Sequence, residues 1–403
     1  MMNISIIGAG YVGLITGVGF AKLGNRVSIV DLNNDLIQKL NNNQMPFYEP
    51  DLEDYIKNPE VAENIFFYSD YESSIDKNTD IVFVCVQTPT DFESGKTDIT
   101  YLKNALVKLN NFKNYEFTIC IKSTVNSKLI KYICKEINLE YEKLIFNPEF
   151  LREGSALFDF FNPDRIVIGG SDINSLDKCL KLYESFECEK IITDSISSQI
   201  IKYLSNTYLA MRLSFVNETF KLASEFGGNP NQILDAIGKD NRIGNHYFRP
   251  SPGWGGSCFP KDVKEVSNFL QNDYQSPLIS KIIESNELHM DWFADYLLRS
   301  LKEKNLSNII LIGAPFKENT DDMRESPTLK IYDRLANKFQ NTFILDLKVK
   351  LASDYKLIES IEDLEEDTLY VEMFPDSSNE RLELLKEVNK QKNSFVLKMW
   401  ETS

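Results

Sequence analysis

The sequence is poor in the residues that most often do acid–base and metal chemistry. It holds only two histidines, His246 and His289, so proton transfer at neutral pH must depend on lysine, carboxylates and water. Its six cysteines form no CxxC pair and no metal-ligand spacing with these histidines, which argues for reduced thiols and against a bound metal. No apolar run approaches the ~18 residues of a membrane helix, and the N-terminus lacks a signal-peptide pattern. We therefore expect a cytoplasmic protein with no membrane partner.

Basic residues are also in deficit. The 44 Lys and Arg against 60 Asp and Glu give a formal net charge of −16, which disfavours nucleic acid as a partner. Any anionic ligand must be met by local cations or by helix N-termini. The length of 403 residues, with 42% hydrophobic and 26% charged residues, is typical of a globular protein of two or three domains.

The N-terminal segment carries the first motif. An apolar strand that begins near Ile4 leads into Gly8, Gly10 and Gly13 at GxGxxG spacing, and a second strand ends at Asp31. The glycines permit a tight turn, a close approach of pyrophosphate, and packing of helix on strand, although glycines at such positions often serve packing alone. Asp31 can bind a ribose 2′-hydroxyl and would repel a 2′-phosphate. The segment therefore predicts a site for NAD rather than NADP.

The order of strands and helices predicts the architecture. Strands at 80–86 and 117–124 alternate with helical stretches, which is typical of a doubly wound parallel sheet. The segment 308–314 nearly repeats 3–9, so a second, smaller α/β region is expected near the C-terminus. The fold class is α/β, with two Rossmann-like doubly wound domains joined by a long central helix and a helical span. The expected domains are an NAD-binding domain at 1–195, a central helical and dimerisation domain at 196–304, and a C-terminal α/β domain at 305–403.

A long helix is predicted over 197–226. Lys202 and Asn206 lie four residues apart on one side of it, and a solvated surface pair is the simplest interpretation. An apolar stripe on nearly the opposite side is longer than one small domain needs, which predicts a homodimer packed through this helix. The stripe comprises Ile200, Leu204, Tyr208, Met211 and Phe215.

The stretch SPGWGGSCFPKD, residues 251–262, places Cys258 among glycines just before a predicted helix. The glycines leave little steric protection, so a ligand can approach the backbone closely. A thiol near a helix N-terminus and close to Lys261 should have a lowered pKa, whereas burial would raise it. Cys258 is either an inert loop cysteine or a nucleophile. The other five cysteines lie in apolar or helical contexts, so Cys258 is the candidate.

Six motifs follow one another along the chain: GxGYVG at the N-terminus, STV at 123–125, NPEFLREG at 147–154, IKYLSNTYLA at 201–210, RIGNHY with GGSCFPKD at 242–262, and FKENTDDMRESP at 316–327. Together they resemble the UDP-glucose 6-dehydrogenase family, within the UDP-glucose/GDP-mannose dehydrogenases. The resemblance covers nearly the whole chain, and Ser257 and Lys261 around the cysteine are more similar to the UDP-glucose branch than to relatives that oxidise UDP-N-acetylhexosamines or GDP-mannose.

The resemblance implies a four-electron oxidation of an alcohol to an acid with two NAD⁺ in turn. Cys258 would capture the aldehyde as a thiohemiacetal, which is then oxidised to a thioester and hydrolysed. Lys202 and Asn206 would stabilise oxyanions. Asp262 and Thr124 would hold a water for proton transfer. Glu153 would assist hydrolysis as a base, and Glu149 could share a helical face with it.

The resemblance also implies binding residues. Arg242 would reach substrate from a neighbouring subunit, Arg249 and Lys317 would contact the diphosphate, and Arg324 would meet NAD from the second α/β domain. The implied NAD-binding residues are Gly8, Gly10, Tyr11, Val12, Gly13, Asp31, Thr88, Thr124, Glu153 and Arg324. The implied substrate-binding residues are Glu149, Phe150, Leu151, Lys202, Asn206, Arg242, Tyr247, Arg249, Ser251, Gly255 and Lys317.

Two other function classes stay open at this point. An NAD-binding regulatory protein could use an exposed Cys258 to sense oxidants, but it has no need for Lys202, Asn206, Asp262 and Glu153 in matching places. A one-step hydroxyacid dehydrogenase needs neither the cysteine nor a diphosphate-binding domain. Counting the NADH made per sugar nucleotide distinguishes the three classes, with two, none and one expected.

Overall fold

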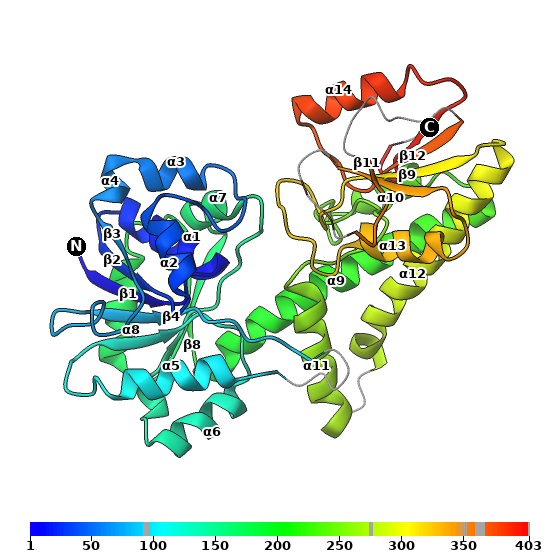
Figure 1. Ribbon diagram of the computed structural model, residues 1–403. Helices are drawn as coiled ribbons and strands as arrows, with labels where there is room; N and C mark the ends of the chain where they lie inside the picture. The colour runs from blue at the N-terminus through cyan, green and yellow to red at the C-terminus, as the bar shows by residue number, and fades with distance from the viewer. Residues whose placement is uncertain are drawn as a thin grey trace. The chain divides into compact units, whose positions relative to one another are not determined.

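The chain contains two α/β units and a long helix. The computed structural model describes residues 1–91, 97–273, 277–346, 349, 351, 353–358 and 367–401. It divides into two compact units, Met1–Leu204 and Ser205–Ser403. Each unit holds a mainly parallel sheet with helices packed on it (Figure 1). The predicted fold class is confirmed, while the domain boundaries near 195 and 304 remain predictions. Among the described residues, no helix is long and apolar enough to cross a membrane.

The first unit is built on an eight-stranded sheet in the order β3-β2-β1-β4-β5-β6-β7-β8. Its central strands are buried on both faces, as expected when helices cover a parallel sheet on both sides. Ile4 and Ile6 pack with α1, and Ile7 packs with α5 and α6 on the opposite face. The strands are β1 Asn3–Ile7, β2 Arg26–Val30, β3 Ile65–Tyr68, β4 Ile81–Val84, β5 Thr118–Ile121, β6 Ile145–Phe146, β7 Arg165–Gly169 and β8 Glu189–Thr193.

Local capping fixes several helix starts in this unit. Asn33, Asn126 and Asp172 each accept a backbone N–H with their side chains at the N-termini of α2, α6 and α8. The helices are α1 Tyr11–Lys22, α2 Asn34–Asn41, α3 Leu52–Lys57, α4 Pro59–Ala62, α5 Thr100–Asn110, α6 Ser127–Ile137, the 3₁₀ turn Tyr141–Lys143, α7 Ala156–Phe161 and α8 Ile173–Leu182.

One pairing departs from the parallel sheet predicted for this region. Strand β6 has only two residues, and β7 pairs antiparallel to it through Phe146 and Gly169. The connection between them contains only the six-residue α7. Strands β7 and β8 then pair parallel to each other. The sheet is therefore parallel from β3 through β6 and reverses at β7.

The second unit carries a five-stranded parallel sheet in the order β11-β10-β9-β12-β13. Ile309 and Leu311 pack with α12 and α13, while Ile310 and Ile312 pack with α14 on the other face. The strands are β9 Asn308–Ile312, β10 Thr342–Leu345, β11 Leu357–Ile358, β12 Thr368–Glu372 and β13 Phe395–Leu397. The helices are α10 Pro230–Gly238, α11 Phe259–Asp273, α12 Pro277–Glu303, α13 Pro327–Ala336 and α14 Asn379–Val388.

Helix α9, Ser195–Phe226, confirms the predicted long helix. The side that carries Lys202 and Asn206 was expected to face solvent, but it is buried. Lys202 and Asn206 are buried, at 3% and 8% exposure, and are not a solvated pair. The apolar stripe on the other side is largely open to solvent. Its exposed members, with neighbours at the same helical spacing, are Ile196, Ile200, Leu204, Tyr208, Phe215, Leu222 and Phe226.

Candidate active site

The turn after β1 uses its glycines for different reasons. Gly8 has a φ of +106°, and its N–H donates to the carbonyl of Val30 at 2.7 Å. A Cβ at Gly13 would lie 1.9 Å from the carbonyl oxygen of Gly8, so α1 can pack here only with glycine. A Cβ at Gly10 would meet no atom of the described residues within 4 Å. The space at the start of α1 is therefore open, at the place where a dinucleotide fold binds pyrophosphate.

Asp31 lies at the carboxyl end of β2 and braces this turn. Its Oδ2 accepts the N–H of Ala9 at 2.9 Å, and its Oδ1 accepts the N–H of Asn33 at 3.0 Å. Strand order reverses between β1 and β4, which is where an open α/β sheet binds its ligand. The residues present thus fit NAD: Gly8, Gly10 and Gly13 leave the cradle, and Asp31 stands at the ribose position. Val12 packs against the core cluster beneath the turn.

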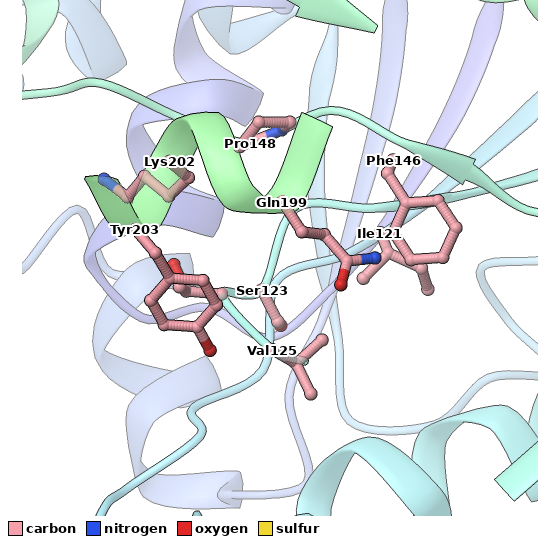
Figure 2. Close-up of a pocket in the computed structure, with 9 residues that line it drawn as sticks. Ile121, Ser123, Val125, Phe146, Pro148, Gln199, Lys202 and Tyr203 are labelled. Atoms are coloured by element: carbon pink, nitrogen blue, oxygen red, sulfur yellow. The ribbon is translucent and has the colours of Figure 1, made fainter. Parts of the chain in front are cut away.

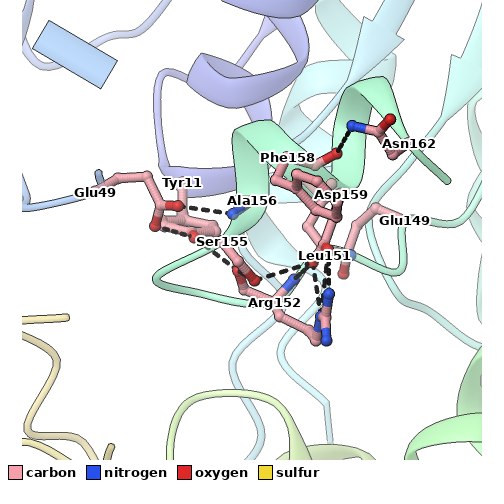
Figure 3. Close-up of polar contacts among 10 residues, drawn as sticks. All are labelled: Tyr11, Glu49, Glu149, Leu151, Arg152, Ser155, Ala156, Phe158, Asp159 and Asn162. Atoms are coloured by element: carbon pink, nitrogen blue, oxygen red, sulfur yellow. Dashed lines mark hydrogen bonds and ion pairs between the residues drawn. The ribbon is translucent and has the colours of Figure 1, made fainter. Parts of the chain in front are cut away.

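Tyr11 connects the turn to the motif loop at 147–155 through a residue that the sequence did not reveal. Its hydroxyl donates to Glu49 Oε2 at 2.5 Å, and Glu49 also accepts the N–H of Ala156 at 2.7 Å (Figure 3). Glu49 accepts the N–H of Gly154 as well, at 2.7 Å. Burial, the hydrogen bond to Glu49 and the charge of Glu153 raise the pKa of Tyr11 well above its usual value. Glu49 therefore connects the start of α1 with the loop at 147–155, and both segments are predicted to contact the cofactor.

The predicted helical face shared by Glu149 and Glu153 is wrong, because 147–155 is a loop between β6 and α7. Pro148 lies at its start, and Gly154 near its end has a φ of +80°, which a helix excludes. Glu149 folds back so that its Oε2 accepts the N–H of Leu151 at 2.7 Å. The two carboxylates consequently have different environments: Glu149 is buried at 9% exposure, and Glu153 is half-buried.

Glu149 and Lys202 form a buried ion pair. Lys202 Nζ donates to Glu149 Oε1 at 2.8 Å, and both side chains are under a tenth exposed. The ammonium also lies 5.5 Å from the ring centroid of Phe150, whose ring contacts the Arg165 guanidinium at 3.9 Å. The ion pair with Glu149 holds the Lys202 ammonium in a fixed place away from bulk water, and a cation fixed in this way can stabilise an oxyanion.

Lys202 lies on the wall of a cavity (Figure 2). Thr124 also lines this cavity. Its carbonyl accepts the Thr88 hydroxyl at 2.8 Å, and Ser123 donates to the carbonyl of Val86 at 2.6 Å. These bonds join the ends of β4 and β5. The predicted cofactor residues Thr88 and Thr124 are thus brought together, and Thr124 and Lys202 share a cavity. The other lining residues are Ile121, Ser123, Val125, Phe146, Pro148, Gln199 and Tyr203.

In the second unit, Asp262 is the centre of a polar cluster. Asn206 Nδ2 donates to its Oδ2 and Lys261 Nζ donates to its Oδ1, both at 2.6 Å. The Asp262 N–H donates to the carbonyl of Cys258 at 2.9 Å, so Cys258 lies at the start of α11. The thiol is half-buried, 3.5 Å from the Ser257 hydroxyl. Three predicted catalytic residues, Cys258, Asn206 and Asp262, therefore belong to one cluster.

Lys261 has a different use from the one expected. From the sequence, Lys261 was expected to lower the pKa of the Cys258 thiol. In the structure its ammonium is ion-paired with Asp262. Burial opposes the charge of Lys261, yet the attraction and hydrogen bond of Asp262, with the charges of Glu265 and Cys258, raise its pKa overall. Asp262 is almost fully buried at 1% exposure. Lys261 is therefore an ion-pair partner of the carboxylate beside the thiol.

The glycines of the cysteine loop serve packing rather than an open approach to the backbone. A Cβ at Gly255 would lie 1.9 Å from the carbonyl oxygen of Glu325, and one at Gly256 would lie 2.8 Å from the ring of Phe316. The Gly256 N–H donates to the carbonyl of Arg324 at 3.0 Å. The cysteine loop therefore packs directly on the segment 316–325, which carries Lys317.

The predicted cations differ in their settings. Burial and the charge of Asp376 raise the pKa of Glu318, and the charges of Lys317 and Arg249 partly oppose this rise, so these two cations face the same carboxylate. Arg242 and Arg324 project to solvent and pair with near neighbours in the chain, Asp240 and Asp322. Tyr247 adopts a φ of +54°, and its ring lies 6.5 Å from that of Phe259.

Comparison with known proteins identifies the family of the chain. Residues 2–187 match the NAD binding domain of the UDP-glucose/GDP-mannose dehydrogenase family, residues 196–288 its central domain, and residues 310–374 its UDP binding domain. The chain belongs to this family. A UDP-glucose 6-dehydrogenase of Rickettsia bellii is 39% identical over 349 residues, which cover 84% of this chain and 79% of the relative.

Solved structures agree with the fold. A UDP-glucose dehydrogenase from Pyrobaculum islandicum is 30% identical, with a TM-score of 0.81 over 93% of this chain and 90% of that one. A UDP-D-ManNAc dehydrogenase from Pyrococcus horikoshii is 23% identical, with a TM-score of 0.80 over 96% and 93%, and supports the fold alone. The protein is an NAD-dependent nucleotide-sugar dehydrogenase. Its UDP binding domain includes Lys317 and Arg324, and the substrate is a UDP-sugar.

Proposed function

We propose that the protein oxidises UDP-glucose to UDP-glucuronate in two steps through a covalent bond to Cys258. The observation that supports the covalent route is the cluster in which Cys258 begins α11 beside Asp262, with Asn206 and Lys261 bound to that carboxylate. A one-step dehydrogenase does not need a thiol at this position. Relatives at 37% and 39% identity that are named UDP-glucose 6-dehydrogenase support glucose as the sugar.

The first oxidation removes a hydride from C6 and a proton from its hydroxyl, which leaves an aldehyde. Bound NAD⁺ supplies the hydride acceptor, and two molecules are consumed in turn. The Cys258 thiolate then adds to the aldehyde carbon. A C–S bond forms, the carbonyl pair moves to oxygen, and that oxygen takes a proton to give the thiohemiacetal.

The second oxidation removes the remaining hydride and the hydroxyl proton from this adduct, which leaves a thioester. Water adds to the thioester carbon, the C–S bond breaks, and the thiolate leaves with its electron pair. The balance is one UDP-glucose, two NAD⁺ and one water giving UDP-glucuronate, two NADH and three protons. Glu153 is the proposed base that takes a proton from this water. It is half-buried, and its charge contributes to the raised pKa of Tyr11.

Lys202 and Asn206 are the proposed donors to negative oxygen in these steps. Lys202 is buried and ion-paired with Glu149, so bulk water does not screen the attraction between its ammonium and a developing alkoxide. Asn206 donates to Asp262, which orients that carboxylate to hold a water with Thr124 for proton transfer. Arg249 and Lys317 are proposed to bind the diphosphate, Arg324 to meet NAD, and Arg242 to reach the substrate of a partner subunit.

The test is a count of products. Purified protein is supplied with limiting UDP-glucose and excess NAD⁺, and we expect two NADH per sugar with uronate as the only acid. The same assay with UDP-N-acetylglucosamine, UDP-N-acetylmannosamine and GDP-mannose decides the sugar. One NADH per sugar would indicate a one-step dehydrogenase, and none would favour a redox-sensing protein. A preference for an N-acetylhexosamine would refute glucose while leaving the chemistry intact.

We further propose a homodimer packed through α9. The stripe on this helix exposes large apolar side chains, from 43% for Ile196 to 84% for Phe226, and proteins seldom leave such a row uncovered. In sedimentation experiments, Tyr208→Glu should raise the dimer dissociation constant at least about 100-fold. The control is Ile173→Glu on α8, where an isolated apolar residue is 72% exposed. An active wild-type monomer at assay concentration would refute the dimer.

A further inference from the structure

The segment that leads to Cys258 is a buried loop. Residues 251–256 include no helix or strand, yet Pro252, Trp254, Gly255 and Gly256 are all buried. Buried backbone N–H and C=O groups cost free energy unless they find partners, and a loop cannot supply these from its own ladder. At Ser251 and Trp254 of this loop, the partners are side chains of α9 and α12.

Asn286 on α12 forms hydrogen bonds with both backbone polar groups of Trp254. Its Oδ1 accepts the Trp254 N–H at 3.0 Å, and its Nδ2 donates to the Trp254 carbonyl at 2.9 Å. Asn286 is 3% exposed, so no bulk water competes for these bonds. The indole N–H of Trp254 also donates to the Ser214 hydroxyl on α9, at 3.0 Å. One residue thus has its backbone and its ring both fixed.

Ser251 is held in the same way three residues earlier. Asn217 Oδ1 on α9 accepts its N–H at 2.9 Å, and His289 Nε2 on α12 donates to its carbonyl at 2.9 Å. Asn217 and His289 are buried at 0% and 3% exposure. The two anchored positions, Ser251 and Trp254, leave the intervening residues little freedom.

We propose that Asn286 is a positioning residue for the nucleophile, because its two bonds to Trp254 set the place from which Gly255–Cys258 enters α11. The inference rests on the proposed function. A polar side chain on this buried face of α12, beside the apolar Met290 and Phe293, is costly unless the loop backbone satisfies it. Misplacement of a reacting group by about 1 Å can lower its rate 100-fold, so the clamp matters to the capture of the aldehyde.

The chain supplies a matched control in the first unit. Asn25 is also buried, its Oδ1 accepts the Met2 N–H at 3.0 Å, and its Nδ2 donates to the Phe20 carbonyl at 3.2 Å. Asn25→Ala therefore removes the same kind of two-pronged contact as Asn286→Ala. It does so at the amino ends of β1 and β2, away from the candidate site.

The experiment measures escape of the aldehyde. Wild type, Asn286→Ala and Asn25→Ala are supplied with UDP-glucose, NAD⁺ and semicarbazide, and the trapped sugar aldehyde is measured against uronate. We expect Asn286→Ala to release about a tenth or more of its product as trapped aldehyde and to lower uronate formation at least about 10-fold. Wild type and Asn25→Ala should release almost none. Hydrogen exchange should show faster exchange at the Trp254 amide in Asn286→Ala only.

Two results would overturn the positioning role. One is uronate formation without aldehyde escape in folded Asn286→Ala, and the other is equal escape from Asn25→Ala. If Asn286→Ala does not fold, Asn286→Asp keeps the acceptor for the Trp254 N–H and loses the donor, and escape above the control is still expected. Failure of the proposed function is distinguishable, because wild type would then make fewer than two NADH per UDP-glucose, whereas failure of the positioning role alone leaves that count at two.

Discussion

The two α/β units begin with nearly the same strand and turn and use them for different ends. Gly8 and Gly313 both have φ above +100°, and each donates its N–H to the end of the neighbouring strand. In each unit the next residue, an alanine, donates its N–H to an aspartate at 2.9 Å, Asp31 in the first and Asp346 in the second. The turn is therefore a shared scaffold.

The segment after the turn decides the ligand. In the first unit α1 begins at once, and the position of Gly10 faces open space. In the second, residues 315–326 intervene before α13, and a Cβ at Gly313 would lie 2.6 Å from the ring of Phe374 and 3.2 Å from the Arg381 guanidinium. The second turn thus has no exposed helix start for a pyrophosphate. Its long loop instead carries Lys317 and packs on the cysteine segment.

The largest expected effect separates the chemistry of the second unit from cofactor binding in the first. Cys258→Ala should lower uronate formation by on the order of 10³-fold or more, because no other group replaces the covalent nucleophile. The NAD⁺ dissociation constant should stay within about twofold, since the cofactor turn is untouched. Uronate yield and NAD⁺ titration check both statements. Retention of a tenth of wild-type turnover by Cys258→Ala would refute the covalent route.

The next test concerns the helix start that directly follows the turn in the first unit and does not follow it in the second. Gly13→Ala should cost about 3 kcal/mol of unfolding free energy, because the new methyl group meets the Gly8 carbonyl. Gly10→Ala should leave the unfolding free energy almost unchanged, since its φ of −72° suits alanine, yet weaken NAD⁺ binding at least about 10-fold by filling the cradle. Denaturant titration and calorimetry measure the two effects. Normal NAD⁺ affinity in Gly10→Ala would contradict the assigned pyrophosphate position.

Acid sensitivity through histidine belongs to the second unit, where both histidines lie. Burial lowers the pKa of His289 to about 4, although its bond to Ser251 opposes this. Between pH 6.5 and 4 the unfolded chain holds the extra proton, so this group makes stability fall as pH falls. His289→Gln should therefore lose ~1.5 kcal/mol less than wild type between pH 6.5 and 5.0. Equal losses in denaturation series at the two pH values would show that His289 does not titrate in this way.

The paired aspartates give the smallest and most direct test. Asp31→Ala and Asp346→Ala each remove a bond to an alanine N–H, and each should cost about 1 kcal/mol of stability. Only Asp31→Ala should also weaken NAD⁺ binding, by about 10-fold, and narrow the gap to NADP⁺. Parallel titrations with the two cofactors measure this difference. The cofactor assignment would be wrong if both variants behaved alike, or if wild type used NADP⁺ equally well.

Local patterns predicted much of the fold and some of the site. The strand ending at Val30, the glycine turn and the end of α9 at Phe226 follow from short-range periodicity and breakers. The side of α9 that is buried did not follow, because burial of Lys202 and Asn206 depends on carboxylates distant in sequence. Glu49 had no local signal at all, since its partners lie at Tyr11, Gly154 and Ala156.

The loop at 147–155 shows why spacing alone misled. Two glutamates four residues apart fit a helix, but Pro148 and the positive φ of Gly154 favour a loop. The glycines of the cysteine loop are similar, because their role depends on Glu325 and Phe316, which no nearby pattern indicates. Asn286 was missed for the same reason: its partner, Trp254, is 32 residues away.

The different exposure of the six cysteine thiols has a practical consequence. Cys85, Cys120, Cys134 and Cys179 are buried, and burial raises the pKa of Cys188. A fluorescent maleimide in slight molar excess should therefore label Cys258 in preference to the other five, without any cysteine having to be removed from the chain. The protein then carries a reporter dye at the proposed nucleophile, where the dye can report the arrival of a nucleotide sugar in single molecules, and the same thiol can anchor the protein to a sensor surface.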